Sequence, residues 1–174
     1  MNTERSNKKA TEFLKKGNNL KRKTQRYEKT FNFPPEKVFP QFCPSRELDW
    51  IEGWDCNLVY TSTGYVEEDC IFTTPESNVL GPGLWIFTEY EPNRKLGLVR
   101  IIGDSVVIHF SIDLADNNDG TSTGVWNLKF TALNESGNKI IESIPDNSPE
   151  MEQAIKGLEY FLETGEMMTA AKKI

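Results

Sequence analysis

Residues 84–112 read LWIFTEYEPNRKLGLVRIIGDSVVIHFSI, and this stretch decides the fold class. It consists of three apolar runs separated by two turn signals, Glu91-Pro92-Asn93-Arg94 and Gly103-Asp104. Short runs that are rich in β-branched and aromatic residues predict strands, and connections this short make consecutive strands antiparallel. The stretch therefore predicts three neighbouring strands of an antiparallel sheet.

The same pattern of strands and turns continues on both sides. Turn signals at residues 63–64, 75–83, 116–120 and 136–138 divide a β region that extends from about residue 54 to about residue 144. Upstream, residues 26–33 alternate polar and aromatic side chains and predict a first strand, which Pro34-Pro35 ends. Two short apolar segments between residues 36 and 50 predict two short helices. The predicted order is one strand, two short helices and six antiparallel strands.

A long amphipathic helix is predicted near the C-terminus. Ser148-Pro149-Glu150 supplies an N-cap, a proline at the first helical position and an acid in the first turn. A sheet with one apolar face has to cover that face, and this helix is the element available for it. The fold class is therefore α+β, with seven curved antiparallel strands wrapped around one helix. The apolar stripe of the helix consists of Met151, Ala154, Ile155, Leu158, Phe161 and Leu162.

Turn geometry predicts which side chains of the sheet face this helix. A two-residue loop at Gly103-Asp104 pairs Val99 with Ile108, and the turns on either side give the same apolar face. Arg100 then points to solvent. The large side chains of the apolar face either line a cavity beneath the helix or fill the space as a dry core. The face comprises Trp85, Phe87, Val99, Ile101, Val106, Ile108, Phe110, Ile112, Trp126, Leu128 and Phe130.

A cavity in this position would make ten of these residues candidates for ligand contact. The predicted pairing also places Glu89 on this face, near its rim. A carboxyl group among aromatic rings is a weak candidate for a catalytic acid or base. The alternative for Glu89 is an ion pair with Lys95 beside the turn. The ten candidates are Trp85, Phe87, Val99, Ile101, Ile108, Phe110, Trp126, Leu128, Leu158 and Leu162.

Charge is distributed unevenly along the chain, whose net charge is −6. Residues 1–30 contain ten basic and three acidic residues, so a basic arm precedes an acidic body. We expect residues 1–24 to be a flexible arm, either solvated or in contact with an anionic partner, and residues 25–172 to form one domain. An acidic body, and basic residues without interleaved aromatic ones, disfavour nucleic-acid binding.

Several classes of protein are disfavoured by what the sequence lacks. No apolar run approaches the ~20 residues of a transmembrane helix, and the N-terminus lacks the apolar segment of a signal peptide. Cys43, Cys56 and Cys70 form no CxxC pair and are accompanied by a single histidine, so neither a metal site nor a cofactor is expected. These features predict a cytoplasmic protein with reduced thiols.

Three segments resemble the START-like (SRPBCC) superfamily. Residues 31–39, FNFPPEKVF, resemble its N-terminal motif, in which an apolar strand is followed by a proline pair, an acid, a base and Val-Phe. Leu48-Asp49-Trp50 is similar to the helix end that precedes the second strand, and residues 88–96, TEYEPNRKL, are similar to a recurring strand and turn. The resemblance implies a helix-grip fold with a deep apolar cavity between the sheet and the C-terminal helix.

Three functional hypotheses remain open, because the superfamily has no common catalytic motif. It includes polyketide cyclases and aromatases, pollen-allergen-type ligand carriers, lipid-transfer domains and co-chaperones. The first hypothesis is binding of a small hydrophobic or amphipathic ligand, lipid-like or polyketide-like. The second is a cyclase-like or dehydratase-like enzyme that uses Glu89 with Tyr60 or Tyr90. The third is a co-chaperone-like module that binds a partner through its surface.

Overall fold

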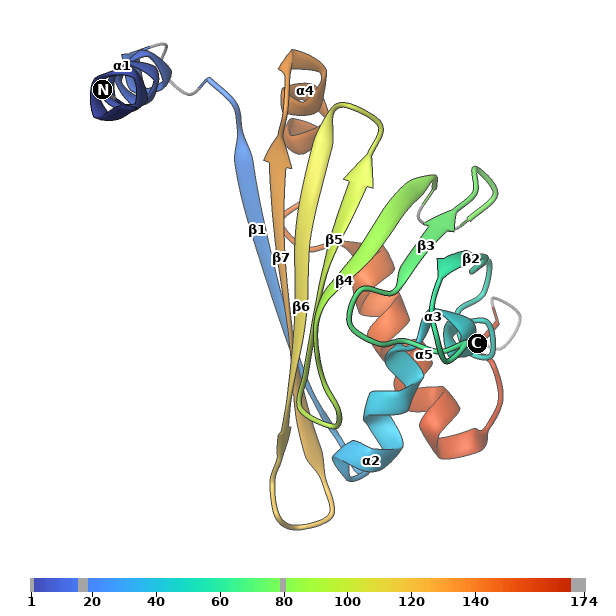
Figure 1. Ribbon diagram of the computed structural model, residues 1–174. Helices are drawn as coiled ribbons and strands as arrows, with labels where there is room; N and C mark the ends of the chain where they lie inside the picture. The colour runs from blue at the N-terminus through green and yellow to red at the C-terminus, as the bar shows by residue number, and fades with distance from the viewer. Residues whose placement is uncertain (1, 16–18, 79–80, 170–174) are drawn as a thin grey trace.

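The computed structural model describes residues 2–15, 19–78 and 81–169. A seven-stranded antiparallel sheet curves around one long helix, with the strand order β1-β7-β6-β5-β4-β3-β2 (Figure 1). The strands are β1 (Arg22–Phe31), β2 (Asn57–Tyr60), β3 (Ile71–Thr74), β4 (Gly83–Glu91), β5 (Lys95–Ile102), β6 (Val106–Asp116) and β7 (Ser122–Ala132). The helices are α1 (Asn2–Lys15), α2 (Pro35–Val38), the 3-10 helix η1 (Phe39–Phe42), α3 (Pro44–Glu47), α4 (Glu135–Ser143) and α5 (Pro149–Thr164). No helix in the described ranges is long and apolar enough to cross a membrane.

Helix α5 begins where the sequence predicts. Ser148 is the N-cap, and its Oγ accepts a hydrogen bond from Met151 N at 3.4 Å. Gly165 ends the helix in the left-handed conformation, with a φ of 72°, which glycine adopts without steric cost. Figure 1 shows α5 lying against one face of the sheet. At the centre of the helix, Leu158 is 1% exposed and anchors it to the core.

A row of alternate residues on β1 holds the segment that leads into α5, and we call this row the β1 seam. Alternate residues of a strand point to the same face, which here is the face that α5 covers. Three of the five contacts satisfy backbone groups of residues 144–148, and the other two are ion pairs. The contacts are Lys23 Nζ to Ile144 O (2.5 Å) and to Asp146 Oδ1 (2.8 Å), Gln25 Nε2 to Pro145 O (2.7 Å), Ser148 N to Tyr27 Oη (2.7 Å) and Lys29 Nζ to Glu159 Oε1 (2.7 Å).

The register of β5 differs from the predicted one by a single residue. The turn after Ile102 contains three residues rather than two, so Ile102 pairs with Val106. On the side of β5 that pairs with β4, a β-bulge between Phe87 and Glu89 also shifts the pairing by one residue. Phe87 therefore pairs with Leu98. A slip of one residue moves every side chain of a strand to the opposite face.

The predicted faces of β5 and of Glu89 were therefore wrong. Val99 and Ile101 lie on the convex face, whereas Leu96, Leu98 and Arg100 lie on the concave face beneath α5. Glu89 lies on the convex face because it pairs with Gly97 after the bulge. By contrast, β6 and β7 pair two residues away from the predicted register, and a slip of two leaves the inward faces of both strands as predicted.

Residues 135–143 form helix α4, whereas the sequence analysis extended the β region through them. Asn134 caps the helix, and its Oδ1 accepts a hydrogen bond from Gly137 N at 2.9 Å. The helix approaches the turn between β5 and β6 so closely that a Cβ atom on Gly137 would overlap Ser105 O. Glycine at this position therefore permits α4 to pack on the end of the sheet.

Strand β1 begins inside the segment predicted to be an arm. Arg22 already pairs with Thr131 of β7, and Lys21 N donates to Asn138 Oδ1 at 2.7 Å. Residues 2–15 form α1, which Figure 1 shows set apart from the sheet. The packed body of the fold thus starts at about residue 21, a few residues earlier than the predicted boundary at residue 25, and the flexibility of the preceding segment stays a prediction.

Two helical glycines should respond in opposite ways to substitution by alanine. Gly137→Ala should lower the free energy of unfolding by about 1–3 kcal/mol, because the new methyl group has to displace backbone. For Gly157 in α5, the nearest atom to an added Cβ is Trp50 O at 3.6 Å, an ordinary contact. Gly157→Ala should therefore stabilise the protein by up to about 1 kcal/mol through helix propensity. Urea denaturation measures both, and equal effects of the two substitutions would contradict the packing described for α4.

Two truncations should locate the start of the folded body. Removing residues 1–18 should leave the melting temperature within about 2 °C of the native value. Removing residues 1–24 also deletes the first three pairs of β1 and the Lys23 contact, and should cost about 1–3 kcal/mol. A large loss of stability in the shorter truncation would instead show that α1 is docked on the body.

Candidate functional site

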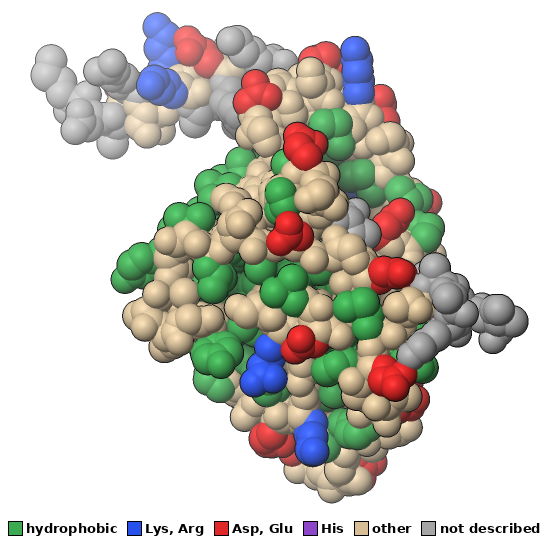
Figure 2. Space-filling model, turned by 90° about the vertical axis from the view of Figure 1, so that its right-hand side faces the viewer, with side chains coloured by type: hydrophobic (Ala, Val, Ile, Leu, Met, Phe, Trp, Pro, Cys, Tyr) green, Lys and Arg blue, Asp and Glu red, His purple; other side chains and the backbone are tan. Residues whose placement is uncertain are grey.

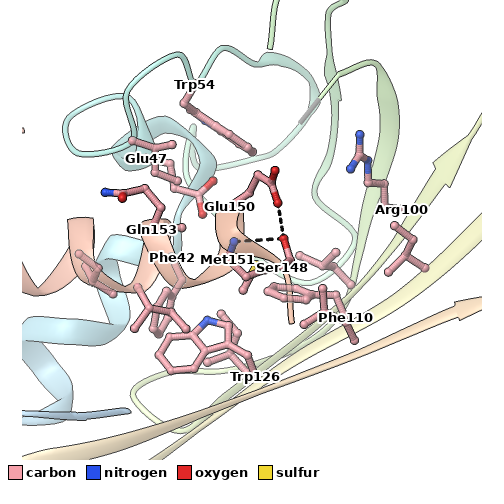
Figure 3. Close-up of a pocket in the computed structure, with 18 of the residues that line it drawn as sticks. Phe42, Glu47, Trp54, Arg100, Phe110, Trp126, Ser148, Glu150, Met151 and Gln153 are labelled. Carbon is pink, nitrogen blue, oxygen red and sulfur yellow. Dashed lines mark hydrogen bonds between the residues drawn. The ribbon is translucent and has the colours of Figure 1, made fainter. Parts of the chain in front are cut away.

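A cavity of about 490 Å³ lies between the concave face of the sheet and α5. The strands supply its floor, α5 supplies its roof, and α3 with the turn that follows supplies one end (Figure 3). The lining is predominantly apolar, which is typical of sites for small organic molecules. The sheet residues that line it are Gln25, Phe72, Trp85, Phe87, Leu96, Leu98, Arg100, Ile108, Phe110, Ile112, Trp126, Leu128 and Phe130.

Seven of the ten residues predicted to contact a ligand line this cavity. Leu162 packs against the core from α5 without reaching the cavity, and Val99 and Ile101 face away from it on β5. The seven are Trp85, Phe87, Ile108, Phe110, Trp126, Leu128 and Leu158. Whether they bind a ligand stays a prediction, but the sheet and α5 do bring them together.

Glu89, Tyr60 and Tyr90, the candidates for catalysis, do not line the cavity. Glu89 Oε1 accepts a hydrogen bond from Lys95 Nζ at 2.9 Å on the convex face, which is the alternative that the sequence left open. Tyr60 lies on the edge strand β2 and is 58% exposed. Tyr90 packs against Phe39, with ring centroids 5.6 Å apart. An acid–base mechanism built on Glu89 therefore has no geometric basis.

Aromatic rings form much of the cavity wall, and all four tryptophans of the chain take part. Phe72 and Trp85 are stacked, with centroids 5.3 Å apart and an interplanar angle of 12°, and Trp54 meets Trp85 at 6.2 Å. The Trp54 and Trp85 N–H groups donate to Pro44 O and Thr74 Oγ1, so the rings present carbon to the cavity. A ligand in this part of the site would meet flat apolar surfaces.

Arg100 is the buried cation of the wall and is 7% exposed. Its guanidinium lies over the Trp85 ring at 4.6 Å, and Nη2 donates to Gly81 O and Pro82 O at 3.2 and 3.3 Å. Burial lowers the pKa of Arg100 to about 10, so the group stays charged at neutral pH. Residue 83 is a glycine because a Cβ atom there would lie 2.7 Å from Arg100 Nε.

Two carboxyl groups at the α3 end of the cavity differ in protonation. Glu47 borders the cavity and is half-buried, and the loss of solvation there raises its pKa from 4.5 to about 8. A hydrogen bond from Ser148 Oγ to Glu150 Oε2, 2.6 Å long, lowers the pKa of Glu150. At neutral pH Glu47 is therefore mostly protonated and Glu150 is ionised. Figure 3 shows both side chains entering the cavity, from α3 and α5, on the same side as Trp54.

The cysteines and acidic residues do not form a metal site in the part of the chain that the structure describes. Cys43, Cys56 and Cys70 are free thiols, two of them buried. Burial is the largest cause that raises the pKa of Cys56, to about 11, and it also raises the pKa of Cys70. Cys56 and Cys70 are therefore protonated at neutral pH and poorly nucleophilic.

Comparison with known proteins shows the fold. No protein-family model and no curated protein matches the chain. A solved protein of Rhizobium leguminosarum is 14% identical, with a TM-score of 0.61 over 83% of this chain and 96% of that chain. Ara h 8.0201 is also 14% identical, with a TM-score of 0.59 over 83% of this chain and 99% of that one. Norcoclaurine synthase from Thalictrum flavum is 10% identical, with a TM-score of 0.62 over 83% and 88% of the two chains.

A second structure of norcoclaurine synthase, solved with dopamine and hydroxybenzaldehyde, is 12% identical to this chain, with a TM-score of 0.57 over 83% of this chain and 89% of that one. At these identities the likeness concerns the path of the backbone and not the activity. The protein therefore has the START-like, helix-grip fold that its sequence resemblance implied.

Sequence reasoning missed the polar groups of the cavity, chiefly Glu47, Gln25 and Arg100. Glu47 and Trp50 are three residues apart in a segment predicted to be helical, and this spacing could have placed Glu47 beside Trp50. Gln25 precedes the predicted first strand by one residue. The sequence predicted that Arg100 faces solvent because the predicted register of β5 was wrong by one residue.

The stability of the protein should fall as the pH rises from about 5 to about 8. The folded state holds the Glu47 proton up to about pH 8, whereas the unfolded chain releases it near 4.5, so the folded state binds more protons in this range. The contribution of Glu47 to the slope should approach about 1.4 kcal/mol per pH unit, and Glu47→Gln should remove it. Urea denaturation across the range measures the slope. Glu89→Gln, on the convex face, is the control, and an unchanged slope in Glu47→Gln would contradict the assignment.

Proposed function

We propose that this protein binds a small, mostly apolar molecule, lipid-like or polyketide-like, in the cavity between the sheet and α5. The observation that carries the proposal is the cavity itself, about 490 Å³ in volume and lined by aromatic and aliphatic side chains from both layers of the fold. Pockets for small organic ligands have volumes of about 300–1,000 Å³ and this kind of lining.

Binding accounts for the arrangement better than the enzymatic alternative does. The polar side chains at the cavity are few, and the catalytic candidates Glu89 and Tyr60 lie outside it. A carrier requires shape and apolar surface, which the wall supplies. We place this activity in the cytoplasm, since free thiols such as the buried Cys43 and Cys70 suit a reducing compartment.

Two neighbouring residues of β5 offer a matched test of the proposal. Leu98 lines the cavity and Val99 faces the opposite side of the sheet. The neutral fluorophore N-phenyl-naphthylamine should bind the native protein with simple saturation. Leu98→Trp should weaken this binding by at least about tenfold because the new ring occupies the cavity, whereas Val99→Trp should leave it unchanged.

Unfolding free energies of the same variants show whether the cavity is empty space. Added bulk in a fully packed core costs about 1–3 kcal/mol, whereas a cavity accepts the indole ring at little cost. Absence of dye binding by the native protein, or equal weakening of binding by Leu98→Trp and Val99→Trp, would overturn the proposed function.

A further inference from the structure

Glu47 is a carboxyl group held in an apolar wall by its backbone. Glu47 O accepts hydrogen bonds from Trp50 N at 3.3 Å and Ile51 N at 2.9 Å, so the turn after α3 fixes the position of the residue. Trp50, Ile51 and Trp54 line the cavity beside it. The side chain therefore enters the cavity among rings and aliphatic groups, where a carboxyl group is costly unless it has a partner.

Hydrogen-bond acceptors at this cavity lack donors. Among the described residues, no hydrogen bond or ion pair reaches the Glu47 carboxyl group, and no donor reaches Gln25 Oε1, although Gln25 is only 5% exposed. Ser148 Oγ bonds to Glu150, the Arg100 guanidinium bonds to two backbone carbonyls and lies over Trp85, and Gln153 Nε2 contacts Met168 Sδ at 3.9 Å, so none of these groups reaches the two acceptors. A ligand that supplies a donor would satisfy the Glu47 carboxyl group or Gln25 Oε1.

We infer that the cavity takes a molecule with an apolar or aromatic body and a protonated amine, and that the amine pairs with Glu47. This inference rests on the proposed function and specifies its ligand class. An ammonium group supplies both the donors and the positive charge that a buried carboxylate requires. Rings such as Trp54 add cation–π attraction.

The charges around the cavity favour a cation over an anion. The titratable and charged groups that share the lining with Glu47 are Glu52 after α3, Glu150 on α5 and Arg100 on β5, and Cys56 is close enough for Glu47 to raise its pKa. Carboxyl groups outnumber the single guanidinium. Figure 2 shows the side of the molecule on which β2, β3 and α3 lie, where acidic side chains are spread among hydrophobic ones and basic side chains are fewer. The net charge of −6 acts in the same direction at long range.

Binding of the amine should expel a proton from the protein. At pH 7 the free amine is already protonated, and Glu47, with a pKa of about 8, mostly carries its own proton. Formation of the ion pair requires the Glu47 carboxylate, so that proton passes to the buffer. Close to one proton should therefore be released for each amine bound. A neutral or anionic ligand would leave the Glu47 proton in place.

Three probes with one aromatic body test the inference: naphthylethylamine, naphthylethanol and naphthylacetate. Isothermal titration calorimetry at pH 7, in two buffers of different ionisation enthalpy, gives affinity and proton release for each. The amine should bind at least about tenfold more tightly than the alcohol, and the acetate most weakly. Glu47→Gln should abolish both the preference for the amine and the proton release while retaining alcohol binding. Glu89→Gln, a matched substitution on the convex face, should behave as the native protein.

The outcomes separate this inference from the proposed function. If no probe binds the native protein, both fall. If amine and alcohol bind equally and no proton is released, the cavity proposal stands and the amine inference is overturned. Should Glu47→Gln not fold, proton release by the native protein decides alone, since its absence refutes the pairing and its presence with the amine but not with the alcohol supports it.

Discussion

The β1 seam sets the relation between the sheet and the helix that covers it, and the cavity depends on that relation. Backbone groups at Ile144, Pro145 and Ser148 find their partners on alternate side chains of β1, so the start of α5 is fixed at the edge of the sheet by hydrogen bonds. Close apolar packing of the helix occurs further along, at Leu158. A helix held at one end by polar contacts and at its centre by packing leaves space over the aromatic floor, and that space is the candidate site.

The sequence predicted the strands, the covering helix and most of the floor, and its error in the facing of β5 came from two local irregularities. The bulge between Phe87 and Glu89 and the three-residue turn after Ile102 each add one residue. Because side chains alternate with a period of two, these additions inverted β5 and the position of Glu89 in β4, and left Trp85, Phe87 and β6 on the predicted faces. The hydrophobic pattern could not reveal the inversion, since β5 carries apolar residues on both faces and the charge in its interior, Arg100, resembles a solvent-facing residue.

The polar groups of the site were less predictable than its apolar ones for a physical reason. Burial of Leu or Phe follows from the pattern of a whole strand, but the position of Glu47 depends on how a four-residue helix and the following turn place one side chain. Its unusual pKa arises from enclosure by residues of α5 and the sheet that are distant in sequence. The cap residue Ser148 was predictable because capping is local.

The aromatic wall has a consequence for how the molecule can be observed. All four tryptophans border one cavity, and the chain has no others. The tryptophan fluorescence of the protein therefore originates entirely at this site, and its quantum yield and emission wavelength depend on what occupies the space beside the indole rings. Energy transfer among rings as close as Trp54 and Trp85 spreads a disturbance at one of them to the signal of its neighbour. Occupation of the cavity can therefore be followed through the protein's own tryptophan residues, without an attached dye.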